Sequence, residues 1–294
     1  MNPEPTFRRI ATNGLNLNVA EAGPPDGPPV ILLHGFPEFW YGWRRQIGPL
    51  AEAGYHVLAP DQRGYNISDK PDGVASYALG HLVDDVVGLV DSTGRERATV
   101  IGHDWGGVVA WGAIARHPGR FDRAVILNAP HPDAMNREIR GNPAQLLKSW
   151  YAFFFQVPRL PEALARRNDF GGMVRSLTAS SRPGTFGPAD FEQYKRAWAE
   201  PKALTSMIHW YRAAFRHRPG PAADPVVEVP TLIVWGAKDK FLGRGVARSS
   251  YALCRDARLE WIEEATHWVQ HEEPARVNGL ILAFLATDPA RAAR

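Results

Sequence analysis

An aspartate lies between evenly spaced glycines in the stretch GHDWGG, residues 102–107. Gly102, Asp104 and Gly106 form a G-x-D-x-G pattern, which is typical of a tight strand–turn–helix connection with a nucleophile at its centre. An aspartate that only caps a helix accepts hydrogen bonds from free N–H groups and does not require such flanking glycines. A tight turn does require them, because larger side chains would collide there. The spacing therefore favours Asp104 as a nucleophile over Asp104 as a helix cap.

Two downstream residues complete a triad in the chain order nucleophile, acid, histidine. Asp239 follows the strand-like run TLIVWG, and His267 follows LEWIEEA. We expect His267 to act as a general base, with Asp239 orienting its imidazole and stabilising its cation. The acid could instead follow the strand-like run RAVIL, but Asn128 occupies that position and carries no charge. His271 lies four residues beyond His267, but the glutamate of the zincin motif is absent, so no metal site is expected.

A His-Gly turn follows the first apolar run, in LLHGFPE at residues 32–38. This turn allows a backbone N–H group to face the nucleophile. We expect an oxyanion to be held between the N–H of Phe36 and the N–H of Trp105, the residue after the nucleophile. His34 is expected to hold the loop through hydrogen bonds, and His103 is likewise expected to be structural.

Short apolar runs must position these residues, and they lack the alternation of a half-exposed strand. Strands buried on both faces have this pattern, which predicts a parallel sheet covered by helices. These runs occupy residues 29–35, 56–61, 98–104 and 123–129, and further strands are expected at residues 231–236 and 259–265. An alternating stretch around Asn13-Gly14 predicts an antiparallel hairpin before them, and residues 79–94 have the pattern of an amphipathic helix. The polar residues above follow the strands, at the edge where α/β sheets bind ligands.

The pattern changes after Pro130, where helical and aromatic-rich segments replace the strands. Residues 218–230 have the composition of a linker that returns to the sheet. The sequence therefore predicts one α/β core domain, residues 1–130 and 223–294, interrupted by a helical cap at residues 131–222.

The composition excludes several classes of function. The net charge is +3 over 294 residues and the basic residues are scattered, so nucleic-acid binding has no electrostatic support. No run approaches the ~18 apolar residues of a transmembrane helix, and the N-terminus lacks the apolar run of a secretory signal. The single cysteine, Cys254, excludes an internal disulfide and fits a reducing compartment. We expect a cytoplasmic protein without a membrane span.

The motifs HGFPEFWYGWRRQIGPLAEAGYHVLAPDQRGY, GHDWGG and THWVQ together resemble the soluble epoxide hydrolases of the α/β-hydrolase superfamily. The resemblance covers essentially the whole chain, including the helical cap, and implies an α/β-hydrolase fold and no cofactor. It also implies a reaction in two halves. Asp104 attacks a carbon of the epoxide and forms an alkyl–enzyme ester, and water activated by His267 then attacks the carbonyl carbon of that ester. The product is a vicinal diol.

Opening an epoxide generates an alkoxide that needs a proton, and in this family two cap tyrosines supply it. The segments WYAFFFQVP and HWYRAAF resemble the two cap segments and offer Tyr151 and Tyr211, with Tyr194 as the alternative if the cap is threaded differently. Tyrosine suits this role because it donates a hydrogen bond yet stays protonated at neutral pH. An apolar pocket for aromatic or alkyl epoxides would be lined by Phe36, Trp105, Trp150 and Phe153.

Haloalkane dehalogenases share the aspartate nucleophile and are the nearest alternative. They hold a halide with indole or amide N–H groups, which Trp105 with Trp150 or Trp210 would supply here. Many dehalogenases, however, have a polar residue at the position that corresponds to Phe36. A non-catalytic binding module is less favoured because the triad is intact, and a serine esterase is excluded because the elbow lacks serine. The expected partner is a small-molecule epoxide, and the expected state is a monomer or a homodimer.

Overall fold

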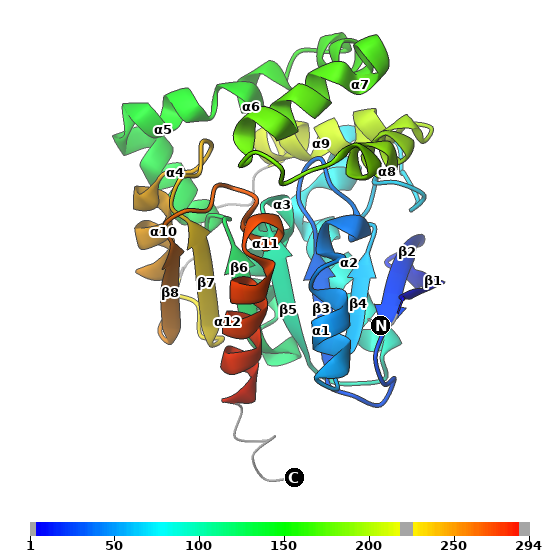
Figure 1. Ribbon diagram of the computed structural model, residues 1–294, viewed down its shortest axis with the longest axis vertical. Helices are drawn as coiled ribbons and strands as arrows, with labels where there is room; N and C mark the ends of the chain where they lie inside the picture. Colours follow the sequence, from blue (N-terminus) through cyan, green and yellow to red (C-terminus); the bar gives the residue numbers. More distant parts are fainter. Residues whose placement is uncertain (1–3, 218–225, 288–294) are drawn as a thin grey trace.

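The structure is a computed structural model that describes residues 4–217 and 226–287. Its centre is one eight-stranded sheet in the order β1-β2-β4-β3-β5-β6-β7-β8, in which only β2 runs antiparallel to its neighbours (Figure 1). The strands are β1 (Thr6–Thr12), β2 (Leu15–Ala22), β3 (Pro29–Leu33), β4 (His56–Pro60), β5 (Ala98–His103), β6 (Phe121–Leu127), β7 (Thr231–Gly236) and β8 (Ala257–Ile262). The predicted hairpin and parallel sheet are both present.

The central strands are apolar without alternation because helices cover both faces of the sheet. Along β3, Ile31 and Leu33 pack in one hydrophobic cluster with α2 (Leu79–Ser92) and α3 (Trp105–Arg116). The neighbouring Val30 and Leu32 pack in a second cluster, with α1 (Ile47–Glu52) and α12 (Pro274–Ala286). In Figure 1 the second pair of helices lies in front of the sheet. Successive residues of a strand point to opposite faces, so a continuous apolar run fills both layers.

A helical cap lies over the carboxyl ends of the parallel strands, between β6 and β7 (Figure 1, top). Its helices are α4 (Pro132–Gly141), α5 (Pro143–Lys148), α6 (Trp150–Phe154), α7 (Leu160–Ser180), α8 (Pro188–Ala199) and α9 (Ala203–Arg216). The backbone of α7 leaves the helical conformation at Arg167–Phe170. The cap predicted at residues 131–222 contains these six helices, of which α4 begins at Pro132, and its predicted end at 222/223 lies outside the described residues.

Short elements complete the core. They are the 3-10 turns η1 (Trp40–Trp43), η2 (Val74–Tyr77) and η3 (Pro118–Arg120), and the helices α10 (Arg244–Tyr251) and α11 (Val269–Glu272). Indole N–H groups join the cap to the core: Trp198 donates to the carbonyl oxygen of Pro37 (2.6 Å) and Trp210 to that of Arg63 (3.1 Å). Among the residues described, no helix has both the length and the apolar character needed to cross a membrane.

Candidate active site

The connection between β5 and α3 is a sharp elbow with Asp104 at its tip. Asp104 has φ 51° and ψ −123°, a conformation that L-residues rarely adopt. A Cβ atom on Gly102 would lie 2.4 Å from the carbonyl oxygen of Gly106, and one on Gly106 would lie 2.0 Å from that of Leu33. The Asp104 side chain accepts no capping hydrogen bond from α3. The glycines thus permit a close approach of backbone segments, and Asp104 does not act as a helix cap.

Replacement of Gly106 by alanine should destabilise the protein by about 3 kcal/mol, because the new methyl group would collide with backbone oxygens at the end of β3. Gly119→Ala is the matched control, since a Cβ atom at Gly119 would meet nothing within 4 Å. It should change the free energy of unfolding by less than about 0.5 kcal/mol. Urea unfolding of both variants checks this, and an equal effect of the two substitutions would contradict the elbow packing.

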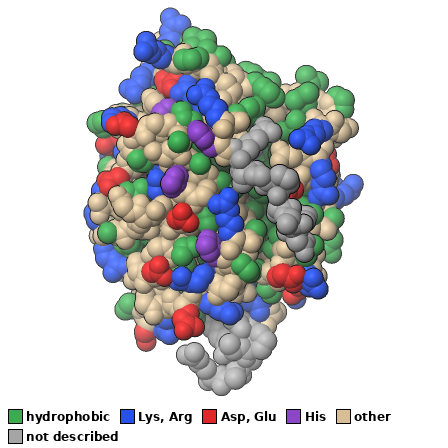
Figure 2. Space-filling view, turned by 180° about the vertical axis from the view of Figure 1, so that it is seen from behind, with side chains coloured by type: hydrophobic (Ala, Val, Ile, Leu, Met, Phe, Trp, Pro, Cys, Tyr) green, Lys and Arg blue, Asp and Glu red, His purple; other side chains and the backbone are tan. Residues whose placement is uncertain are grey.

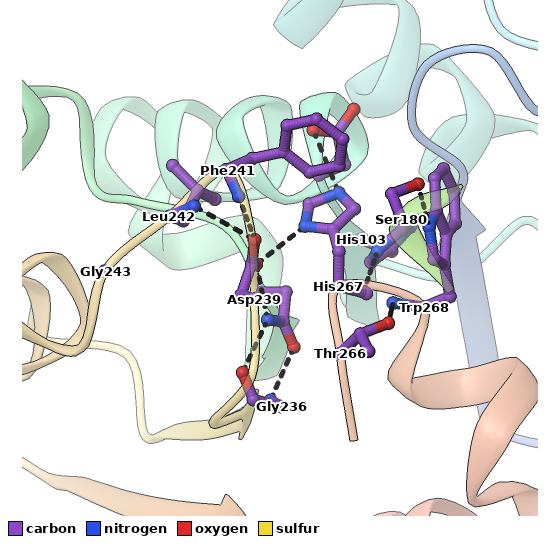
Figure 3. A network of polar contacts seen from close by, with 12 residues as sticks. His103, Ser180, Gly236, Asp239, Phe241, Leu242, Gly243, Thr266, His267 and Trp268 are labelled. Carbon is purple, nitrogen blue, oxygen red and sulfur yellow. Dashed lines mark hydrogen bonds and ion pairs between the residues drawn. The ribbon is translucent and has the colours of Figure 1, made fainter. Parts of the chain in front are cut away.

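His267 lies between the two acids of the predicted triad. Its Nε2 atom is 3.5 Å from Oδ2 of Asp104, and its Nδ1 atom is 2.7 Å from Oδ2 of Asp239. Figure 3 shows the imidazole directed at Asp239, which follows β7, while His267 itself lies in the loop after β8. The structure therefore brings Asp104, His267 and Asp239 together at the carboxyl edge of the sheet.

The carboxylate of Asp239 is held on both of its oxygens. Oδ1 accepts from the backbone N–H groups of Phe241 (2.7 Å) and Leu242 (2.9 Å), and Oδ2 also accepts from Nδ2 of Asn128 (2.7 Å). Burial by itself would raise the pKa of Asp239, but the charge of His267 and these hydrogen bonds lower it below its ordinary value. Asp239 is therefore ionised, and its orientation is fixed before any substrate binds.

The two carboxylates determine the protonation of His267. Burial opposes its charged form, yet Asp239 and Asp104 outweigh burial and raise the pKa of His267 to about 10. The imidazole is therefore a cation while Asp104 is ionised. Anything that removes the charge of Asp104 removes part of this effect, lowers the pKa of His267 and so favours the neutral imidazole, the form that can accept a proton.

The loop after β3 supplies a hydrogen-bond donor to Asp104. The backbone N–H of Phe36 donates to Oδ1 of Asp104 over 2.8 Å. His34 holds this loop as expected, since its Nε2 atom accepts from the N–H of Gln62 (3.0 Å), and burial lowers the pKa of His34 to about 4, so the ring is neutral. Trp105, the second predicted donor, is the first residue of α3 and directly follows Asp104.

Two cap tyrosines lie in an aromatic cluster near Asp104. The rings of Tyr151 and Tyr211 are 6.0 Å apart, and Tyr211 also packs edge-on against Trp105 (5.0 Å) and Phe36 (5.3 Å). Burial, and after it the negative charge of Asp104, raises the pKa of both phenols well above the ordinary value. Both are therefore protonated hydrogen-bond donors at neutral pH. Tyr194 is directed elsewhere, and its hydroxyl donates to Glu38 (2.6 Å).

Trp150 and Phe153 do not line this cluster, contrary to the expectation from sequence. Trp150 is 65% exposed, and Phe153 is 47% exposed and packs against Phe215. The reason is helical geometry: residues four apart share a face, so Tyr151 and Phe155 point inward while Trp150 and Phe153 point outward. Phe155 takes the predicted place, with its ring 5.4 Å from Phe36 and 4.8 Å from Tyr211.

Known proteins with this architecture share the fold and much of the sequence. The family described as alpha/beta hydrolase fold matches residues 28–274. The chain is 48% identical to the AB hydrolase superfamily protein YfhM of Bacillus subtilis over 94% of this chain and 96% of that protein. It is 37% identical to epoxide hydrolase 4 of Mus musculus over 97% of this chain and 80% of that protein. A crystal structure of the Bacillus megaterium epoxide hydrolase with an inhibitor aligns with a TM-score of 0.87 and 30% identity, covering 95% of this chain and all of that one.

The chain belongs to the epoxide hydrolase family of the α/β hydrolases.

One buried charge in this epoxide hydrolase family member was not singled out from sequence. Glu38, in the loop after β3, is 1% exposed and accepts hydrogen bonds from Tyr194, from Nε2 of His271 (2.7 Å) and from Nε2 of Gln270 (3.2 Å). Burial opposes its charge, but His271 and His103 lower the pKa of Glu38 below its ordinary value. His103 in turn donates from Nε2 to the carbonyl oxygen of His267 (2.9 Å). This hydrogen-bond network therefore holds the loop that carries His267 in place.

His271 thus bonds to Glu38, whereas His267 bonds to Asp239. In the part of the chain that the structure describes, no three histidine, cysteine or carboxylate side chains gather as a metal site would require.

Arg212 is a second residue that sequence reasoning missed. It follows Tyr211 on α9, is 5% exposed, and donates from Nε to the carbonyl oxygen of Phe155 (3.0 Å) and from Nη2 to that of Val157 (2.8 Å). Its Nη1 atom pairs with Glu162 at 2.6 Å. Arg212 therefore fixes the segment after α6, and with it the ring of Phe155, against α9.

Proposed function

We propose that this protein hydrolyses epoxides to vicinal diols and that Asp104 attacks the epoxide to form an alkyl–enzyme ester. The observation that carries the proposal is the position of two protonated tyrosines, Tyr151 and the buried Tyr211, in an aromatic cluster beside an aspartate at the β5–α3 elbow. A carboxylate nucleophile displaces an oxygen or a halide equally well, whereas paired phenols serve to protonate a leaving oxygen.

In the first half-reaction, Oδ2 of Asp104 bonds to one epoxide carbon as that carbon's bond to the ring oxygen breaks. Tyr151 and Tyr211 share the developing charge of the ring oxygen, and one of them transfers its proton to it. Oδ1 then becomes the carbonyl oxygen of the ester and stays in contact with the N–H of Phe36, which bonds to Oδ1 in the free enzyme (2.8 Å). The same contact stabilises the oxyanion that forms when water adds to the ester.

In the second half-reaction, esterification has removed the negative charge of Asp104, one of the groups that raises the pKa of His267. His267 then gives up its proton, which restores the tyrosine that protonated the ring oxygen. As a neutral base it takes a proton from water, whose oxygen attacks the ester carbonyl carbon, and Asp239 stabilises the imidazolium that forms. When the oxyanion collapses, the ester C–O bond breaks, the departing diol oxygen takes the proton of the new Asp104 hydroxyl, and the free carboxylate is restored.

The indole N–H groups of the cap do not support the alternative function, hydrolysis of carbon–halogen bonds. A halide site would need an indole N–H from the cap, but that of Trp210 donates to Arg63 and Trp150 is on the outer surface. The assay that tests the proposal incubates the protein with styrene oxide and, separately, with 1-bromobutane. We expect diol from the first and no halide from the second, and halide release without diol formation would overturn the proposal.

Replacement of Tyr211 by phenylalanine should slow alkylation of Asp104 by about 100-fold, because it removes one of two donors to the ring oxygen. Rapid-quench measurement of ester formation with excess enzyme checks this. Tyr194→Phe is the matched control, since the Tyr194 hydroxyl donates to Glu38 and not to the pocket, and it should leave the alkylation rate within about threefold of wild type. An unchanged rate in Tyr211→Phe would exclude Tyr211 from the acid role.

A further inference from the structure

Exposed hydrophobic side chains concentrate on one part of the cap. Seven of the eleven large hydrophobic side chains that are exposed among the described residues lie within residues 146–164. This cluster, here called the cap patch, consists of Leu146, Leu147, Trp150, Phe153, Val157, Leu160 and Leu164. Leu147 is 74% exposed, more than any other of the eleven. Exposed apolar residues scattered singly over a surface are ordinary, but their concentration in one segment of the cap indicates a surface that binds something.

The cap patch forms the outer side of the layer that covers the candidate active site. Its residues belong to α5, α6, the start of α7 and the connection between them, which lie across the top of the molecule in Figure 1, away from the sheet. Figure 2 shows hydrophobic, lysine and arginine side chains together at this end of the molecule. One face of α6 carries Tyr151 toward Asp104, and the other carries Trp150 into the cap patch.

The cap patch has a basic border. Residues 137–167 include six arginines and lysines but only two carboxylates. Both carboxylates are engaged: Glu162 is buried against Arg212 (2.6 Å), and Glu138 accepts from the hydroxyl of Ser249 (2.7 Å). Arg159, Arg166 and Arg167, by contrast, are exposed. The segment therefore combines exposed apolar side chains with an excess of positive charge.

We propose that the cap patch docks this protein on an anionic lipid surface. Apolar side chains that enter the headgroup region and cations that attract anionic lipids are the two components of interfacial membrane binding. A second copy of the chain is a poorer occupant, because a two-fold contact would place the same arginines against one another. The proposal goes beyond epoxide hydrolysis and stands whether or not Asp104 is the nucleophile. Its consequence is that apolar compounds dissolved in the lipid would reach the protein on the side where α6 covers the site.

Co-sedimentation with lipid vesicles tests the proposal. The full-length protein should pellet with vesicles of phosphatidylcholine containing phosphatidylglycerol, and much less with phosphatidylcholine alone. Binding should weaken in 0.5 M NaCl because the electrostatic component is screened. Equal binding to the two kinds of vesicle, or no binding to either, would overturn the proposal.

Two sets of variants separate the apolar and the charged components. Leu147→Ser/Trp150→Ser should lower the partition coefficient at least about tenfold, and Arg166→Ala/Arg167→Ala should lower it about fivefold for each arginine. Ile67→Ser is the matched control, since Ile67 is 47% exposed but lies outside the cap patch, and it should bind as the wild type does. Unchanged binding in both test variants would contradict the proposal, and the arginine variant keeps the test valid if the apolar variant fails to fold.

Light scattering without vesicles tests whether a second copy of the chain covers the cap patch. We expect the same molar mass for the wild type and Leu147→Ser/Trp150→Ser at every concentration. A wild-type dimer that this double substitution converts to monomers would mean that a second copy covers the cap patch, and would overturn the proposal.

Discussion

Asp104→Ala should lower kcat/KM for styrene oxide by about 10⁴-fold or more, to the level of the uncatalysed reaction in the assay. The substitution removes the atom that bonds to the substrate, and Asp239, the other acid of the triad, cannot replace it. Asp239 is held away from the pocket by Asn128, Phe241 and Leu242. Initial rates of diol formation, measured by chromatography at several substrate concentrations, check the expectation.

The matched control for this variant is another aspartate at the end of a strand. Asp61 follows β4, is buried, and accepts from the N–H of Trp40 (3.0 Å) and from Nδ2 of Asn18 (2.8 Å). Asp61→Asn should therefore lower the melting temperature but leave kcat/KM within about tenfold of wild type. Diol formation by Asp104→Ala at a rate close to that of the control would exclude Asp104 as the nucleophile.

His267→Gln should stop the reaction half-way. Alkylation of Asp104 needs no base, so the variant should still form the ester, while hydrolysis of the ester should slow by about 10³-fold because no group takes the proton from water. The intact protein should then gain the mass of one substrate molecule, and proteolysis should locate that mass on the peptide that contains Asp104.

His271→Gln is the control, because it makes the same change in a histidine four residues away that bonds to Glu38. It should accumulate no adduct. Continued turnover by His267→Gln without an adduct would contradict the role of His267 in the second half-reaction.

The strands and the elbow could be predicted because each has a distinct pattern in the sequence. Strands covered on both faces contain continuous apolar runs, so β3 to β7 and the residues at their ends could be placed on one edge of a sheet. The edge strand β8, with Arg258 and Glu260, is only partly buried and left a weaker pattern. The collisions that a Cβ atom would make at Gly102 and Gly106 explain why the glycine spacing identified the elbow. Asp239 and His267 then followed from their positions directly after strands.

The inner face of the cap could not be predicted, because α6 has only five residues, Trp150–Phe154. So short a helix among consecutive aromatic residues has no periodicity that shows which of them point inward, and Trp150 and Phe153 were assigned to the pocket in place of Phe155. Glu38 was missed for a different reason. A single acid in a loop is usually exposed, and only the fold shows that His271, Gln270 and Tyr194 surround it.

A single turnover in H₂¹⁸O, with enzyme in excess over styrene oxide, distinguishes attack by the Asp104 carboxylate from direct attack by water. If Asp104 forms an ester, the oxygen added to the substrate comes from the carboxylate and the labelled water replaces it there. We therefore predict an unlabelled diol from the first turnover and a gain of about 2 Da in the peptide that contains Asp104. A diol that carries ¹⁸O from that first turnover, with no label on Asp104, would mean that water attacks the epoxide directly and would contradict the account.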